Sequence, residues 1–288
     1  MERAVKADKP FFIWHAPSRM HVYTRLKPES RHLATHISSE EDVFGSGLLE
    51  HDGHVGQLLD KLDELKIADN TIVSYTTDNG PEQSSWPDAG TTKFRGEKMT
   101  TWEGGVRVPF MVRWPKKIPA GLKLNGISSH EDVFPTIAAA VGEKNLRKAM
   151  EKEFKVYIDG ENNLDYWRGK SKKSARNHFF YYYESQLTAI RVGPWKMHFA
   201  SKPGGRYYED LVTHTMPKLF NLRKDPMEHY DGVTGFHQIM KKSWVFQPAI
   251  AMLTEHIKTF EKFPPRQEAA SLNINEAIKK AKSVSTTR

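Results

Sequence analysis

Apolar residues recur through residues 40–66 at the spacing of an α-helix. They fall at Leu48, Leu49, Val55, Leu58, Leu59, Leu62 and Leu65. This period of about 3.6 residues predicts a helix from about residue 40 to residue 66. A turn at 68–70 and a β-branched run at 71–76 then predict a strand. Because ligands of open α/β sheets lie at the carboxyl ends of strands, the residues that follow Thr76 stand where chemistry is expected.

Three further runs complete the first part of the chain. Residues 10–14, which are short, apolar and aromatic, predict a buried parallel strand. Residues 106–113 predict another strand, with Pro109 near an edge or a bulge. Residues 130–141 predict a helix that stops at Gly142. These elements indicate an α/β protein with a partial mixed or parallel sheet sandwiched by helices.

The pattern changes after about residue 175. Short strands separated by Gly, Pro and polar turns are predicted at 178–183, 189–192, 195–199 and 218–222. A closing helix is predicted at 247–260. We therefore expect three parts: residues 1–175, a small C-terminal subdomain of antiparallel sheet plus helix at 176–264, and a basic tail at 265–288.

Charge and composition limit the kinds of partner that the chain is expected to bind. The net charge is +8, but residues 258–288 hold seven basic and three acidic residues, which is half of that excess. A solvated basic face and tail therefore explain the charge. The sequence shows no nucleic-acid-binding motif and no apolar run of membrane-spanning length, so neither partner is expected. The chain has no cysteine, which excludes disulfides and a thiol nucleophile within it.

Two segments carry candidate chemistry. Asp78 and Asn79 follow a predicted strand and offer the oxygen ligands that Ca²⁺ or Mg²⁺ prefers, although Asp-Asn-Gly is also an ordinary turn. Residues 93–109 contain glycines, threonines and Lys98, which could cradle an anionic group. The segment lacks P-loop spacing, and by its chemistry alone a Gly-rich turn before a strand is the favoured interpretation.

Taken in order, these segments resemble the sulfatase family, which belongs to the alkaline-phosphatase superfamily. The matching segments are 50–65 (EHDGHVGQLLDKLDEL), 68–73, 78–80, 98–109 (KMTTWEGGVRVP), 113–115, 129–136, 159–160, 167–170 and 219–226. The likeness covers about residues 8 to 260, and its order and spacing make it specific. It implies an alkaline-phosphatase-like fold, with residues 1–175 as the C-terminal portion of the catalytic domain.

The resemblance also implies an activity, the hydrolysis of sulfate esters by an arylsulfatase-type enzyme. Family members use a formylglycine made from Cys or Ser and a Ca²⁺ ion, with Mg²⁺ as the alternative ion. Asp78 and Asn79 match two metal ligands, Lys98 matches the lysine that contacts sulfate and helps to protonate the leaving group, and His21 matches a substrate-side histidine. The implied substrate is an anionic sulfate ester, either a small molecule or a glycan. Glu103 and Arg107 are expected to fix the loop by pairing.

The formylglycine motif C/S-x-P-S-R and two further metal-binding aspartates of the family have no counterpart in this sequence. Residues 15–19 (HAPSR) resemble the motif, but histidine cannot become formylglycine, and only about sixty residues separate this segment from Asp78. We therefore expect a chain that supplies half of the metal site and the substrate-side Lys98 and His21, without the nucleophile-bearing N-terminal segment. Alone, such a chain should bind metal weakly and be inactive, because Ca²⁺ takes about six to eight oxygen ligands.

Two alternatives remain open. One is a phosphodiesterase or phosphonate hydrolase of the same superfamily. The other is a non-catalytic remnant that serves as a binding or assembly partner, for example of a complementary N-terminal sulfatase segment. Exported relatives suggest a periplasmic or secreted protein, but the sequence itself does not indicate a compartment.

Overall fold

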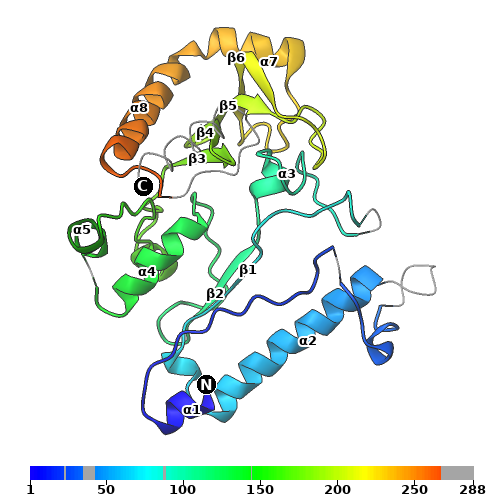
Figure 1. The fold of residues 1–288 in the computed structure, drawn as a ribbon, viewed down its shortest axis with the longest axis vertical. Coiled ribbons are helices and arrows are strands. Elements are labelled where there is room, and N and C mark those ends of the chain that lie inside the picture. Colours follow the sequence, from blue (N-terminus) through cyan, green and yellow to red (C-terminus); the bar gives the residue numbers. More distant parts are fainter. Residues whose placement is uncertain (23, 35–42, 87–88, 144, 267–288) are drawn as a thin grey trace, which may run out of the picture.

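The computed structural model describes residues 1–22, 24–34, 43–86, 89–143 and 145–266. It has two regions (Figure 1). The first holds the helices α1 (Glu2–Lys6), α2 (Val43–Glu64) and α4 (Val133–Ala140) around a two-stranded sheet. The second holds a four-stranded sheet with two helices. Of the expected basic tail, residues 267–288 lie outside the described residues.

The long predicted helix and the strand after it are confirmed. α2 covers Val43–Glu64, and residues 40–42 of the prediction lie outside the described residues. A 3₁₀ turn at Ala68–Asn70 leads into β1, Val73–Thr76. Few side chains of α2 are buried, and Leu48, Leu49 and Leu58 of its apolar stripe are exposed.

β1 pairs with β2 (Phe110–Arg113) in antiparallel register, with Tyr75 opposite Met111. The predicted strand at 106–113 is shortened because the chain forms the short helix α3, Glu103–Val106, before Pro109. No parallel pair occurs among the described residues. Both predicted strands of the first sheet are therefore present. The prediction was a mixed or parallel sheet, and the pair that the structure describes is antiparallel.

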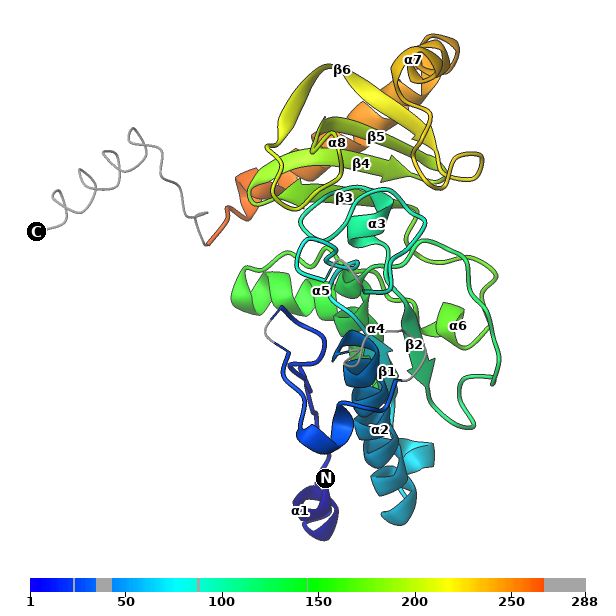
Figure 2. The same cartoon turned by 90° about the vertical axis from the view of Figure 1, so that its right-hand side faces the viewer.

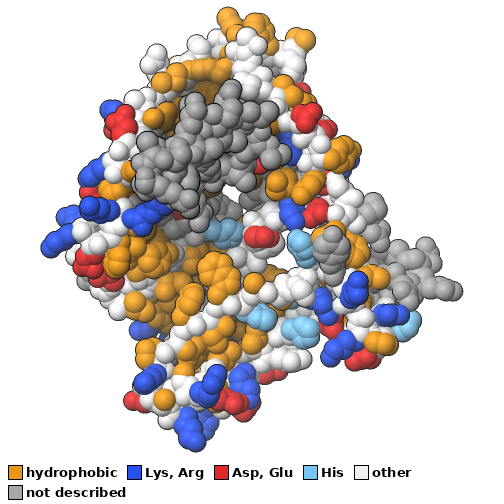
Figure 3. Space-filling model, in the orientation of Figure 1, with side chains coloured by type: hydrophobic (Ala, Val, Ile, Leu, Met, Phe, Trp, Pro, Cys, Tyr) orange, Lys and Arg blue, Asp and Glu red, His pale blue; other side chains and the backbone are white. Residues whose placement is uncertain are grey.

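The prediction of a buried strand at 10–14 is wrong. The segment is extended but forms no ladder, and the side chains of Phe12 and Trp14 are 75% and 84% exposed. A strand needs a neighbour to take its N–H and C=O groups, and the sheet that the structure describes here ends at β1 and β2. Hydrophobic side chains gather over this part of the surface, in the lower half of the view (Figure 3).

The predicted helix at 130–141 is confirmed as a 3₁₀ turn, His130–Asp132, followed by α4. Ser129 caps this start, because its hydroxyl accepts the Glu131 N–H and its own N–H donates to the Asp132 carboxylate at 2.9 Å. Gly142 follows the helix with φ +106°, a left-handed conformation that glycine tolerates. Buried Asp132 also binds Arg176 at 2.7 Å, so the helix start is tied to the entry of the second region.

Short helical turns connect the two regions. They are α5 (Leu146–Ala149), a π turn at Met150–Phe154 and α6 (Leu164–Trp167).

No helix in the described part of the chain combines the length and hydropathy that a membrane crossing requires.

The second region contains an antiparallel sheet, as predicted, and its strand order is that of a meander. Its strands, in spatial and sequence order, are β3 (His178–Tyr183), β4 (Gln186–Val192), β5 (Trp195–Ser201) and β6 (Val212–Asn221). The predicted closing helix is α8, Phe246–Lys262. The helix α7, Gly232–Lys241, was not predicted. It contacts β6, whereas α8 contacts β4 (Figure 2).

The two faces of this sheet differ, because successive side chains of a strand point to opposite faces. Ile190, Met197 and Leu219 form an apolar core with Val245 and Ala249 beside α8. On β5 and β6 the alternate residues Lys196, His198 and Phe220 are also buried, and these contact the segment that contains Trp102 and Glu103. The second face therefore serves as the base of residues 93–109, which we call the Lys98 loop.

Candidate active site beside the Lys98 loop

Lys98 and His21 lie together although 77 residues separate them in the sequence. The Lys98 Nζ atom is 3.3 Å from His21 Nε2. His21 sits in a turn held by Thr24, whose hydroxyl donates to the His21 carbonyl oxygen at 2.8 Å. A neutral imidazole that accepts from the ammonium group can pass or receive a proton along this contact.

Asp78 and Asn79 lie in the loop at the carboxyl end of β1, as predicted. Gly80 follows them, and its N–H donates to the Gly105 carbonyl oxygen at 2.9 Å. A Cβ at Gly80 would lie 1.7 Å from the Gly104 oxygen, so only glycine allows this approach of the two loops. The Lys98 N–H then donates to the Pro81 carbonyl oxygen at 2.9 Å. The segment with Asp78 and Asn79 is thus bonded to the Lys98 loop.

The donor chemistry of Asp78 and Asn79 suits a divalent cation. The Asp78 side chain is exposed, and the Asn79 Nδ2 donates to the Gly80 carbonyl oxygen at 2.8 Å, so that its Oδ1 is the end left available. Among the described residues, no group of three or more His, Cys, Asp or Glu side chains could hold a metal. These two residues therefore fit a divalent ion as part of a ligand set, and a bound ion would polarise an anionic substrate.

Glu82 is a residue of the site that sequence reasoning missed. Its Oε2 accepts from Lys98 Nζ at 2.8 Å, and Ser85 donates to its other oxygen. Burial favours the neutral acid, but Lys98 and Ser85 outweigh burial and hold the pKa of Glu82 below its usual value. A partly buried lysine favours a carboxylate partner, and an acidic residue four positions after Asp78 was the available signal in the sequence.

Glu97, next to Lys98, was also missed. Its carboxylate is 1% exposed and accepts from the Ser84 hydroxyl at 2.7 Å and from the Tyr207 N–H at 2.9 Å. Burial opposes its charge, yet these donors lower the pKa of Glu97. Glu97 therefore fixes the backbone beside Lys98 to both the loop after β1 and the second region.

Charged residues are buried beneath the Lys98 loop. Lys196 Nζ lies 3.0 Å from Glu103 Oε1 and 3.2 Å from Glu228 Oε1, and all three side chains are buried. Burial opposes the charge of Lys196, but Glu228 and Glu103 raise its pKa above the usual value. Glu228 also accepts the Glu103 N–H at 2.6 Å. The expected pairing of Glu103 with Arg107 is a longer contact of 3.9 Å, so Lys196 is the main partner of Glu103.

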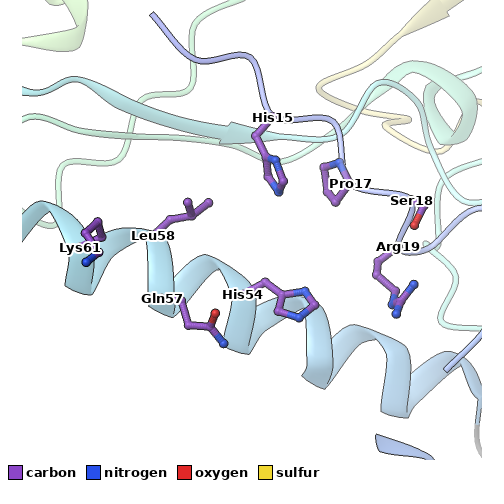
Figure 4. Close-up of a pocket in the computed structure, with 8 residues that line it drawn as sticks. All are labelled: His15, Pro17, Ser18, Arg19, His54, Gln57, Leu58 and Lys61. Atoms are coloured by element: carbon purple, nitrogen blue, oxygen red, sulfur yellow. The ribbon is translucent and has the colours of Figure 1, made fainter. Parts of the chain in front are cut away.

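The segment 15–19, which resembles the formylglycine motif, lies along α2 (Figure 4). His15, Pro17, Ser18 and Arg19 line one side of a groove of about 580 Å³, and His54, Gln57, Leu58 and Lys61 of α2 line the other. Arg19 pairs with Glu50 at 2.7 Å. The segment thus packs on α2, whereas His21 is the residue that reaches Lys98.

Two family models match the chain. Residues 2–143 match the sulfatase family, and residues 174–282 match the family described as the C-terminal region of aryl-sulfatase. The steryl-sulfatase of Homo sapiens is 33% identical over 247 residues, which are 77% of this chain and 40% of that protein. Arylsulfatase A of Homo sapiens is 31% identical over 253 residues, with 82% and 47% covered.

Among solved structures, the PsFucS1 sulfatase from Pseudoalteromonas sp. superposes with a TM-score of 0.81 at 29% identity. The match covers 93% of this chain and 52% of that chain. The chain belongs to the sulfatase family. Its predicted fold class, an alkaline-phosphatase-like α/β fold with a C-terminal antiparallel subdomain, is confirmed. The chain spans about half the length of the relatives it matches, or less.

Proposed function

We propose that the chain supplies one half of the active site of an arylsulfatase-type hydrolase of sulfate esters. The observation that carries this proposal is the contact of Lys98 Nζ with His21 Nε2, 3.3 Å apart, on a loop bonded to the Asp78–Asn79 segment. Cleavage of an S–O ester bond leaves an alkoxide or phenoxide oxygen that must gain a proton. Lys98 as an ammonium ion can donate it, and His21 lies within reach to exchange protons with Lys98.

The other roles in the reaction need groups beyond these four residues. Asp78 and Asn79 would hold part of a Ca²⁺ or Mg²⁺ coordination sphere, and the remaining oxygens would come from a complementary sulfatase segment and water. That segment would also carry the formylglycine residue, which would supply the nucleophile of the reaction. We propose the same division of the chain as the sequence suggested, at residues 175 and 264, although the C-terminal family match runs on to residue 282.

Exposed apolar side chains in the first region support a complementary segment. They include Phe12, Ile13, Trp14, Leu48, Leu49, Leu58, Met111, Phe134 and Val141. Single proteins seldom expose large apolar patches, so side chains of this kind are suited to contact with a partner. The half of the sulfatase fold that this chain does not span is the occupant we propose, and export to the periplasm or cell exterior would suit such an enzyme.

The test reunites the two halves. The chain would be mixed with the part of the PsFucS1 sulfatase that it does not match, carrying formylglycine, and assayed with an aryl sulfate and an aryl phosphodiester. We expect sulfate hydrolysis by the mixture only, and a loss of about 10²–10³-fold in kcat for Lys98→Ala. Lys93→Ala, at an exposed position in the same loop, is the matched control and should retain the rate.

Two outcomes would contradict the proposal. Faster cleavage of the phosphodiester would favour a phosphodiesterase or phosphonate hydrolase. A complex that forms but hydrolyses neither ester would favour a non-catalytic assembly partner.

A further inference from the structure

Glu82 and Lys98 are held side by side by the backbone as well as by their side chains. The Lys98 N–H donates to the carbonyl oxygen of Pro81, the residue before Glu82, at 2.9 Å. The Lys98 Nζ atom donates to Glu82 Oε2 at 2.8 Å. The side chains of Lys98 and Glu82 are only 20% and 16% exposed, so water and salt screen this ion pair less than they screen a pair on the open surface. Glu82 is therefore a fixed neighbour of Lys98.

The carboxylate of Glu82 is held at both of its oxygens. The Ser85 hydroxyl donates to Oε1, while Lys98 donates to Oε2. The adjacent Ser84 has a different partner, because its hydroxyl donates to Glu97 Oε1 at 2.7 Å. The two serines thus bind two different carboxylates, and the contact with Ser85 keeps Glu82 directed at Lys98.

The two carboxylates that these serines bind differ in their surroundings. Glu97 is 1% exposed and accepts from neutral donors, the Ser84 hydroxyl and the Tyr207 N–H. Glu82 instead contacts an ammonium group at the candidate site. Because Lys98 and Ser85 outweigh burial and hold the pKa of Glu82 below its usual value, Glu82 is an anion at neutral pH. Glu82 therefore brings a negative charge to the site and is not suited to donate a proton there.

Lys98 has one donor left for an anion. An ammonium group carries three N–H donors and no acceptor. Glu82 takes one of them at 2.8 Å, and His21 Nε2 lies 3.3 Å from the same nitrogen. A sulfate oxygen that binds Lys98 must take the third N–H, close to the negative charge of Glu82. Two like charges a few Å apart repel each other, which lowers affinity about fivefold even at the dielectric constant of water.

We propose that Glu82 is a positioning residue that acts through Lys98, as a counter-charge that limits how tightly Lys98 binds sulfate. This inference rests on the proposed function, in which the sulfate group lies at Lys98. Hydrolysis of a sulfate ester leaves inorganic sulfate, a dianion, in the site. A carboxylate beside Lys98 favours the departure of this product, whereas Lys98 and His21 without Glu82 would retain it.

Calorimetric titration of the whole chain with inorganic sulfate tests the inference without turnover. Glu82→Gln removes the charge but keeps an oxygen that can accept from Lys98, so it should tighten sulfate binding about fivefold or more at low ionic strength. The gain should shrink as sodium chloride is added, because salt screens the repulsion that the variant removes. A residue that only supported the fold would give the opposite sign, since its loss would loosen the Lys98 loop and weaken binding.

Three further variants separate charge from other effects. Glu82→Asp keeps the negative charge on a shorter side chain, and its sulfate affinity should stay near that of the unchanged chain. Glu255→Gln also removes a carboxylate that pairs with a lysine, but at an exposed position on α8, and it should change nothing. Lys98→Ala should weaken sulfate binding, whether Glu82 is present or replaced by Gln.

The outcomes distinguish the two proposals. If Lys98→Ala weakens sulfate binding but Glu82→Gln leaves it unchanged or weakens it, the role of Glu82 is overturned and the proposed function stands. Sulfate binding that is indifferent to Lys98→Ala contradicts the proposed role of Lys98 instead. Absence of sulfate binding by both the unchanged chain and Glu82→Gln contradicts both.

Discussion

The two sheets of the chain differ in how far their apolar surfaces are covered. In the second region, Ile190, Met197 and Leu219 are at most 2% exposed beneath α8. In the first region, Met111 on β2 is 56% exposed, and the extended segment at 10–14 has no strand beside it in the described part of the chain. The second region thus has a core of its own, whereas the first region has a surface suited to a further layer.

The candidate site lies where these regions meet, and each region supports different residues of it. Lys98 is anchored from the well-covered side, through Glu97 to Tyr207 and through Glu103 to Lys196. Asp78 and Asn79 follow β1, which belongs to the sparsely covered sheet. In the proposed function, the groups for the sulfate would therefore be fixed by this chain, and the metal ligands would be the part that depends on a partner.

The largest effect is expected beneath the Lys98 loop. Glu228→Ala would leave Lys196 and His198 buried without their shared carboxylate, and should lower the free energy of unfolding by about 3–5 kcal/mol in urea denaturation. Glu255→Ala, which removes an exposed carboxylate on α8, is the control and should leave the transition in place. Similar transitions for the two variants would show that the regions are not held together by this network.

A pair of truncations compares the two sheets directly. Leu219→Ala should cost about 2–5 kcal/mol, because it opens a cavity in a covered core. Met111→Ala should cost less than about 0.5 kcal/mol in the chain alone, because its side chain is mostly exposed. Equal costs in thermal or urea unfolding would mean that the first region is covered in solution, for instance by self-association.

Stability should also depend on pH through His198. Burial, only partly offset by Glu228, lowers the pKa of His198 from 6.5 to about 4. Between these pH values, His198 therefore binds a proton in the unfolded chain but not in the folded chain. The contribution is fully present above about pH 6.5 and is lost as the pH falls towards 4, about 3 kcal/mol in all. Burial favours neutral Glu228, but Lys196 and His198 lower its pKa to about 2, which adds a loss in the same direction below about pH 4.5.

His198→Gln is the variant that checks this dependence. It should flatten the curve of unfolding free energy against pH between 6.5 and 4, and it should leave below that range the part of the Glu228 contribution that Lys196 causes. An unchanged slope would assign the acid sensitivity to another group.

The smallest effect on the isolated chain is expected for the exposed aromatic residues. Phe12→Ser and Trp14→Ser should leave its unfolding transition nearly unchanged, because neither side chain is buried. Both should weaken association with a complementary sulfatase segment, measured by calorimetry. Tyr230→Ser, which also removes an exposed aromatic side chain but in the second region, should not affect association.

Local sequence patterns predicted most elements but not the contacts between them. The helix α2, the strands β3 to β5 and α8 lie within about three residues of their predicted bounds, whereas β6 begins at Val212, six residues before the strand predicted at 218–222. The segment at 10–14 has strand character, yet a strand exists only with a neighbour, which no local pattern supplies. The family resemblance brought Lys98 and His21 to attention, and the structure places them in contact.

The residues that support the site could not be predicted either, because their contacts join parts of the chain that are far apart in the sequence. Glu228 lies 125 residues from Glu103, and Tyr207 lies 110 residues from Glu97, so neither contact leaves a local trace. Lys196 alternates with apolar residues on β5 and would be taken for an exposed position, whereas it is fully buried between two carboxylates.

The measurement that tests the central claim most directly is a calorimetric Ca²⁺ titration of the purified chain, followed in parallel by aryl sulfate hydrolysis. With two side-chain ligands from Asp78 and Asn79, we predict millimolar or weaker affinity and no turnover by the chain alone. Affinity should tighten, and turnover appear, on adding the complementary segment, and Asp78→Ala should remove both gains. Micromolar Ca²⁺ binding together with aryl sulfate hydrolysis by the chain alone would contradict a divided active site.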